Sequence, residues 1–196
     1  RTSFSGQCMS ENLYAAPQAQ LIEPAVREDG SQPFYIVSLL KFNVLFYLTM
    51  GLYSIYWFYR HWKAWKIRSG EDIWPVPRSI FSLFFVHALF SRFSQTLASE
   101  QQRRGAIWAT VYLVASIASN IISRLGGEDF GWWDLGSLVC FVAMGLACAS
   151  GQQIANEACE DPQGRRNAHF SAANIAWILA GGLFWLVVLA GAAVDT

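Results

Sequence analysis

The stretch TMGLYSIYWFYRHWKAWK, Thr49 to Lys66, decides the fold class that this sequence predicts. It begins as an uncharged aromatic run and changes at Arg60, beyond which Lys and Arg become frequent while Trp persists. Trp and Tyr concentrate where a membrane meets water, and Lys and Arg concentrate on the cytoplasmic side of a span. The stretch therefore predicts an apolar helix that ends in a basic, aromatic membrane anchor.

The composition also favours a membrane protein. Charged residues make up 14% of the 196 residues, against about 25% in a typical soluble domain, and nine residues are Trp. The net charge is zero, so we expect no nucleic-acid partner. The four Cys have no CxxC spacing, which argues against a disulfide framework or a zinc site. A soluble all-helical domain is the alternative, but the last three hydrophobic segments are apolar all round and leave no water-facing side.

The chain divides into a polar tail, residues 1–33, which we expect to be disordered, and a helical membrane domain, residues 34–196. The domain contains five hydrophobic segments, at about 42–59, 79–93, 105–123, 135–152 and 170–194. The last three are long enough to cross about 30 Å of hydrocarbon, and the first is near the lower limit. The second is short and is predicted to be re-entrant or interfacial. The prediction is an all-α polytopic transmembrane helical bundle in which four segments span.

The distribution of Lys and Arg supports this topology. Five spans with the N-terminus outside would place six of these residues inside and eight outside. If the second segment stays on the inner face, the count becomes ten against four, as the positive-inside rule requires. The ratio improves further if the first segment does not cross either, and this version stays open. We expect a multi-pass protein of the cell inner (plasma) membrane with its basic region, Arg60 to Arg104, in the cytoplasm.

Small residues recur at four-residue spacing in the last three segments, where they let helix backbones approach closely in lipid. The first two segments are bulky and aromatic instead. We therefore predict that the last three segments form a tightly packed bundle and that the first two form a lipid-facing collar. The predicted helix-packing residues are Ala115, Ser119, Ala143, Ala147, Gly151, Ala172, Ala176 and Ala180.

Two groups of polar residues are candidates for function. Basic residues just cytoplasmic of a span attract anionic lipid at about 1 kcal/mol each, so we predict a lipid or partner contact in the basic linker. Its residues are Arg60, Trp62, Lys63, Trp65, Lys66 and Arg68. Polar groups at membrane depth are costly and suggest a polar path, for which the candidates are His87, Arg92 and Asn120. The simpler interpretation of this path is snorkelling of Arg92 and hydrogen bonding between helices.

No motif in the sequence predicts catalysis, a metal or a cofactor. There is no Gly-rich phosphate loop, no GxSxG and no HExxH. One loop contains several metal-capable side chains whose spacing matches no standard site. These side chains are Glu157, Cys159, Glu160, Asp161 and His169.

The stretch from Lys41 to Lys66 contains the pattern T-x-G-x-Y-x-x-Y-W, at Thr49, Gly51, Tyr53, Tyr56 and Trp57. In this pattern it resembles the first span of small uncharacterised bacterial inner-membrane proteins with a domain of unknown function. An N-x-x-x-x-D-P that starts at Asn156, and Asn174 at the start of the final apolar segment, are similar too. The resemblance implies a bacterial inner-membrane protein, and it implies no activity, cofactor or catalytic residue.

The leading hypothesis is a non-enzymatic accessory or scaffold protein that binds a membrane complex or anionic lipid. We expect membrane lipids as partners, together with a protein partner or further copies of this chain in a homo-oligomer. The alternative is a small oligomeric channel or transporter. An integral lipid-modifying enzyme has the least support.

Overall fold

The computed structural model describes residues 32–95, 97–126 and 131–194, and within these ranges the fold is entirely helical. The all-α prediction is therefore confirmed, while residues 1–31 of the predicted tail lie outside the described ranges. The helices are α1 Leu39–Leu48, α2 Tyr53–Ser69, α3 Pro75–Ile80, α4 Ser82–Ser94, α5 Ser99–Leu125, α6 Trp132–Ala158, a 3-10 helix at Arg165–Asn167, and α7 Ala172–Val194.

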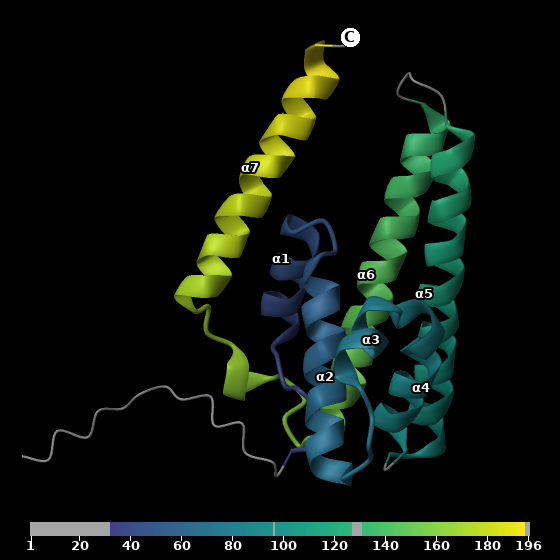
Figure 1. The fold of residues 1–196 in the computed structure, drawn as a ribbon, viewed down its shortest axis with the longest axis vertical. Coiled ribbons are helices and arrows are strands. Elements are labelled where there is room, and N and C mark those ends of the chain that lie inside the picture. The colour runs from purple at the N-terminus through teal and green to yellow at the C-terminus, as the bar shows by residue number, and fades with distance from the viewer. Residues whose placement is uncertain (1–31, 96, 127–130, 195–196) are drawn as a thin grey trace, which may run out of the picture.

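Helices α5 and α6 form a long antiparallel hairpin that runs the length of the helical body (Figure 1). Each has 27 residues. At 1.5 Å per residue that is about 40 Å, which exceeds the roughly 30 Å hydrocarbon core of a bilayer. Both are long and apolar enough to cross a membrane, judged by length and composition. They contain the third and fourth predicted segments.

The first predicted segment, 42–59, is not the single helix that its uncharged run suggests. The chain turns after α1, and α2 runs back antiparallel to it (Figure 1). Met50 and Gly51 have φ angles of 50° and 82° in this turn, and a left-handed conformation ends an α-helix. The Thr49 hydroxyl donates to a carbonyl of α1 at 2.7 Å and accepts from the Tyr53 N–H at 3.0 Å. Thr49 thus satisfies a backbone group of each helix at the turn.

The second predicted segment, 79–93, is also divided. Helix α3 begins at Pro75, and proline suits a first helical position because its missing N–H would have no partner there. The helix ends at Ile80 with Phe81 as its C-cap, and α4 follows directly with 13 residues. A helix of that length is too short to cross a bilayer.

The core consists of the aromatic side chains of α1, α2 and α4, packed against the half of α5 and α6 that lies away from their connecting turn. Trp57, Phe58, Phe90 and Phe93 are all fully buried. Their rings meet mostly edge to face, as between Trp57 and Phe58 at a centroid distance of 4.9 Å and an angle of 83°. The predicted lipid-facing collar is therefore wrong, because the first two segments supply much of the core.

Small residues of α6 explain this arrangement, because they make room for rings. A Cβ atom at Gly151 would overlap the Phe90 ring of α4, and one at Gly145 would overlap the Tyr47 side chain of α1. Of the predicted packing residues, three are buried and two are half-buried. The buried ones are Ala115, Ala147 and Gly151, and the half-buried ones are Ser119 and Ala143.

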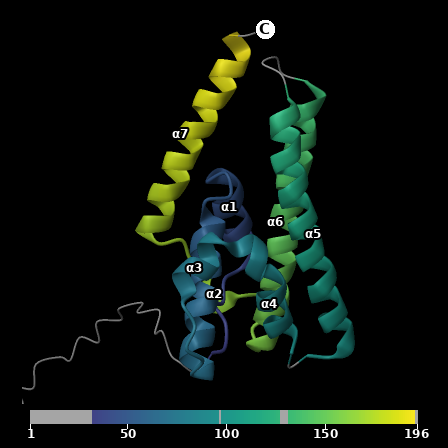
Figure 2. The same cartoon turned by 45° about the vertical axis from the view of Figure 1, so that its right-hand side comes forward.

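Helix α7 diverges from α5 and α6 and packs mainly against α1 (Figure 2). Gly181 lies so close to the Leu48 carbonyl that no Cβ would fit, and Trp185 Nε1 donates to the Tyr47 carbonyl at 3.0 Å. The predicted small-residue contacts of this segment are not made within the described chain. The residues concerned, which are exposed instead, are Ala172, Ala176 and Ala180.

Candidate functional site

A group of buried polar side chains joins α2 to α6 in the centre of the core, and we call Trp57, His61, Gln152 and Asn156 the Gln152 network. Gln152 Oε1 accepts from Trp57 Nε1 at 2.5 Å and lies 3.1 Å from His61 Nε2. Its Nε2 donates to Asn156 Oδ1 at 2.7 Å and to the Tyr35 carbonyl at 3.0 Å. All four network side chains are fully buried. A satisfied network in a low-dielectric core fixes the geometry of the elements it joins.

The network also defines the protonation of His61. Trp57 Nε1 can only donate, so the oxygen of the Gln152 amide must face it, and His61 must then donate to the same oxygen from Nε2. His61 Nδ1 is left unprotonated, with no hydrogen-bond partner in the described part of the chain. Burial lowers the pKa of His61 from 6.5 to about 3, because the charged form loses its hydration. The imidazole is therefore neutral near pH 7.

The last turn of α6 and the loop that follows it hold the extended segment that precedes α1. Asn156 Nδ2 donates to the Val37 carbonyl at 3.0 Å, and Asn167 Nδ2 donates to the Ile36 carbonyl at 2.9 Å. Gly164 has a φ of 62° and lies where a Cβ would overlap the Val37 backbone. These side chains satisfy carbonyls that belong to no helix or sheet.

Lys41 connects the first turn of α1 to the loop that precedes α7. Its ammonium donates to Asn167 Oδ1 at 2.7 Å and to the His169 carbonyl at 2.6 Å. The residue is only 4% exposed, and burial lowers the pKa of its ammonium below the usual value. Two neutral oxygen acceptors of the loop before α7 therefore hold a desolvated cation.

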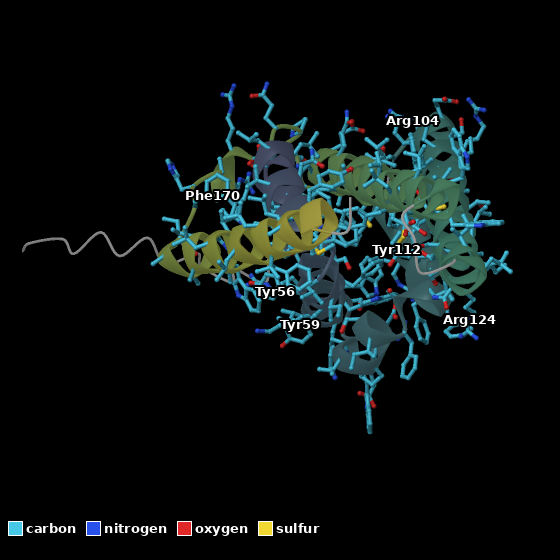
Figure 3. All side chains as sticks on the ribbon, turned by 90° about the horizontal axis from the view of Figure 1, so that it is seen from above. Tyr56, Tyr59, Arg104, Tyr112, Arg124 and Phe170 are labelled. Carbon is cyan, nitrogen blue, oxygen red and sulfur yellow. The ribbon has the colours of Figure 1, made fainter. Side chains whose placement is uncertain are left out.

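A cavity of about 280 Å³ lies between the α1–α2 turn and the start of α7, and we call it the turn cavity. Its walls are mostly apolar. The Tyr56 hydroxyl accepts from Arg60 Nη1 at 2.8 Å, and Figure 3 shows Tyr56 on the α7 side of the molecule. The lining residues are Leu45, Thr49, Leu52, Tyr53, Tyr56, Ser171, Ala173, Asn174 and Trp177.

The T-x-G-x-Y-x-x-Y-W pattern thus has a structural explanation. Thr49 and Gly51 build the turn between α1 and α2. Tyr53 and Tyr56 line the turn cavity, and Trp57 belongs to the Gln152 network. The pattern specifies a helical hairpin with a site on either side of α2.

The basic linker is not a uniform surface. Trp62 is fully buried, which corrects the prediction that it contacts lipid or a partner. Arg78 and Arg92 stack on its ring with guanidinium carbons 4.6 Å and 5.3 Å from the centroid. Arg92 also pairs with Glu71 at 3.1 Å. Trp62 is therefore the centre of a cation–π stack that joins α2, α3 and α4.

The other residues of the basic linker are half-buried or exposed. The Arg60 guanidinium lies 4.6 Å from the ring centroid of Tyr35, and Lys66 Nζ donates to the Ile73 carbonyl at 2.9 Å. Several of these cations are therefore occupied by contacts within the chain. Arg60, Lys63, Trp65 and Lys66 are half-buried, and Arg68 is exposed.

The three residues of the predicted polar path do not come together. His87 is exposed, with Nε2 3.2 Å from Thr110 Oγ1 on α5. Arg92 belongs to the stack around Trp62, and Asn120 is exposed on α5. The described structure offers no common path lined by these side chains.

The loop after α6 shows no metal-binding arrangement in the ranges that the structure describes, where no three His, Cys, Asp or Glu side chains converge. Asp161 instead accepts from the backbone N–H groups of Arg165 and Arg166 at 3.1 Å and 3.0 Å. Burial raises the pKa of the Cys159 thiol to about 11, so the thiol stays protonated near pH 7.

A comparison of the chain with protein-family models, curated proteins and solved structures finds no match. The function of the sites must therefore be inferred from their own geometry.

The candidate residues chosen from the sequence did not include His61, Gln152 or the lining of the turn cavity. One signal for Gln152 exists in the sequence, since Gln152 and Asn156 share a helix face at the end of an apolar run, where polar groups are costly.

Proposed function

We propose that the chain is an integral inner-membrane protein that works without catalysis, as an accessory or scaffold subunit. The observation that carries this proposal is the apolar exterior of α5, α6 and α7, combined with a polar network in the interior. A continuous apolar surface of this kind marks a contact with lipid or with another protein. Large side chains between 45% and 65% exposed include Val114, Ile117, Ile121, Leu138, Val139, Leu183, Leu186 and Val187.

The proposed topology has three spans, α5, α6 and α7, and a re-entrant α1–α2 hairpin. Among the Lys and Arg of the described ranges, Arg124 alone lies at the end where α5 turns toward α6. Figure 3 places Arg124 and Arg104 on the α5 side of the molecule. A cytoplasmic location for the other basic residues agrees with the positive-inside rule. It also agrees with the version in which the first segment does not cross.

Topology can be tested by labelling in intact cells with a membrane-impermeant maleimide. In a chain whose Cys8 and Cys140 are replaced by Ala, so that no accessible native thiol reacts, we expect Leu125→Cys to react from outside and Arg68→Cys to react only after the membrane is opened. Both native side chains are exposed, so the fold itself should shield neither introduced Cys from the reagent. Labelling of both variants from the same side would overturn the three-span topology.

The proposed partner surface is the outer face of α7. This helix packs mainly against α1, and its outer face combines small and large apolar side chains. Burial of apolar surface does not drive helices together in lipid, whereas small residues allow the close backbone approach that does. An exposed helix with Ala at every fourth position therefore suits another transmembrane helix.

The test is native mass spectrometry of the protein extracted gently from its own membrane. We expect a stoichiometric complex that Ala176→Leu weakens, because Leu would hold the two backbones apart. Gly182→Leu is the control within α7, since a side chain there would meet nothing within 4 Å. A monomeric chain with bound lipid only would overturn the accessory role, and a closed ring of this chain alone would favour the channel.

A further inference from the structure

The outer side of α3 and of the start of α4 is apolar and exposed. Trp74 and Phe84 are 71% and 76% exposed, and every exposed residue from one to the other is apolar. A surface helix of a soluble protein carries polar residues on its outer side, whereas a contiguous apolar patch marks a contact with a membrane or another protein. We call this surface the α3–α4 patch, and its residues are Trp74, Val76, Pro77, Ile80, Phe81 and Phe84.

The start of α3 suits surroundings without water. The first N–H groups of a helix have no acceptor within the helix, and an unpaired N–H is costly in hydrocarbon. Pro75 and Pro77 stand at the first and third positions of α3, where neither has an N–H. Just before the helix, Lys66 Nζ donates to the Ile73 carbonyl at 2.9 Å. The backbone of the patch therefore presents fewer unpaired polar groups than an ordinary helix start.

The patch lies on the membrane side of basic residues in the proposed topology. The last turn of α2 carries Lys66 and Arg68. Figure 1 and Figure 2 both place α3 above that end of α2, toward the middle of the molecule. The cytoplasmic leaflet of a bilayer has the same order, since its acyl chains lie inside and its negative headgroups face the cytoplasm.

The charge around the patch is positive. Between residues 62 and 95 five Lys or Arg stand against two carboxylates. Glu71 pairs with Arg92 at 3.1 Å. Asp72 lies 3.6 Å from Lys66 Nζ. An anionic surface therefore complements this part of the molecule better than a neutral one.

Arg78 is the cation of α3 itself. Its guanidinium carbon lies 4.6 Å from the ring centroid of Trp62 and 5.1 Å from that of Phe85. Stacking of this kind uses the flat face of a guanidinium and leaves its N–H groups at the edge to donate. A phosphate group accepts two such N–H groups side by side. The patch thus combines an apolar surface with a positioned phosphate donor.

We propose that the α3–α4 patch enters the cytoplasmic leaflet of an anionic bilayer, where Arg78 donates to a lipid phosphate at the border of the patch. The site differs from the outer face of α7, for which a protein partner is proposed. It rests on the proposed membrane location, because that location places the cytoplasm at the end where α2 stops. A second copy or another protein on the patch is a separate outcome of the first test.

The first test measures what surrounds the patch. A nitroxide is attached at Ile80→Cys in the full chain, with Cys8 and Cys140 replaced by Ala, in vesicles of phosphatidylglycerol and phosphatidylcholine. Electron paramagnetic resonance then reads its collisions with oxygen and with a water-soluble nickel chelate. Compared with Arg68→Cys, we expect the ratio of oxygen to nickel collisions to be about tenfold higher, because hydrocarbon excludes the polar chelate.

Three results decide the first test. A ratio at Ile80→Cys equal to that at Arg68→Cys would overturn the proposal, because water would then surround the patch. A nitroxide that neither reagent reaches would also overturn it, because protein would then cover the patch. Leu138→Cys, at an exposed position of α6, reports the membrane location independently. If only Leu138→Cys lies in hydrocarbon, the patch proposal alone fails, whereas nickel access at both positions would overturn the membrane location as well.

The second test examines the headgroup and needs no label. The purified full chain is titrated with equal amounts of phosphatidylglycerol and phosphatidylcholine, and native mass spectrometry measures the ratio of the two bound lipids. Arg78→Gln should lower this ratio about fivefold, the effect of one cation at an anionic surface. Arg166→Gln is the same change at an exposed position outside the patch and should leave the ratio within about twofold. Equal ratios in the two variants would overturn the role of Arg78.

Arg78→Lys separates charge from packing. Lys keeps the positive charge but loses the guanidinium stack on Trp62. We therefore expect this variant to retain most of the preference for phosphatidylglycerol, although it lowers the free energy of unfolding as Arg78→Gln does. A loss of preference equal to that of Arg78→Gln would show that Arg78 acts through packing alone and would contradict phosphate recognition. If the Arg78 variants do not fold, the nitroxide at Ile80→Cys still decides whether the patch enters the bilayer.

Discussion

Gln152→Leu should destabilise the fold strongly, because one substitution removes the acceptor and the donor at the centre of the network. Leu approximates the size of Gln but has no polar atom. The donors of Trp57 and His61 would lose their acceptor, while Asn156 Oδ1 and the Tyr35 carbonyl would lose their donor. None of these groups reaches water easily, because the network is fully buried.

The expected magnitude follows from the number of groups left without a partner. Four polar groups lose a hydrogen bond in the variant. A buried group left unsatisfied costs about 1 kcal/mol at the low end, which gives a total of about 4 kcal/mol. The apolar side chain of Leu offsets about 1 kcal/mol of this by its own burial. We therefore expect a net loss of about 3 kcal/mol in the free energy of unfolding.

Gln153→Leu is the matched control, because it is the same substitution at the next position of α6. Gln153 is half-buried, and its side chain donates to Glu157 at 3.3 Å. Changes at such positions usually alter stability by less than about 0.5 kcal/mol. The two variants therefore have the same amino-acid composition and helix propensity, but only Gln152→Leu removes a side chain of the Gln152 network.

The assay is unfolding of the purified chain in mixed micelles with increasing denaturing detergent, followed by Trp fluorescence. The two variants and the original chain are compared under identical lipid and detergent conditions, so the difference in unfolding free energy is the measured quantity. If Gln152→Leu and Gln153→Leu differ by less than about 0.5 kcal/mol, the network does not hold α2 and α6 together.

Three further outcomes follow from the structure. Gly151→Leu should cost about 3 kcal/mol in the same assay, because the side chain overlaps a ring of α4, whereas Gly182→Leu should change stability little. The free energy of unfolding should fall as the pH drops below about 6.5, by up to about 1.4 kcal/mol per unit, because the unfolded chain protonates His61 while the folded pKa is about 3. Above pH 6.5 this contribution should be constant, and His61→Phe should remove the slope between about pH 6.5 and about pH 5, above the range in which the carboxyl groups titrate. Gly164→Ala should destabilise more than Gly70→Ala, because both positions have positive φ but a Cβ overlaps backbone only at Gly164, and thermal unfolding of the two variants compares them.

The long helices were predictable because the signal is local. Residues 105–123 and 135–152 carry no charge over their whole length, and each run is long enough to cross a bilayer as one helix. Both lie inside helices of 27 residues. The turn at Gly51 was not predicted, because glycine is common within transmembrane helices and does not break them by itself.

The candidate sites were harder to predict because their residues are distant in sequence. Trp57 and Gln152 are 95 positions apart, and Lys41 and Asn167 are 126 apart. In the sequence His61 has basic residues on both sides, and this pattern does not predict that its side chain is buried. The collar prediction failed for the same reason, since an aromatic segment suits lipid and protein interior equally well.

By itself the sequence determined an all-helical chain, its long apolar helices and the concentration of positive charge around the first two segments. These properties depend on composition and on the order of neighbouring residues, which local physics converts directly into helix and charge. Tertiary structure alone decided that α2 folds back on α1, that rings fill the spaces beside the glycines of α6, and that a neutral histidine and two amides meet between α2 and α6. Each of these depends on which surfaces face one another, because burial and hydrogen bonding act between side chains that only the complete fold brings together.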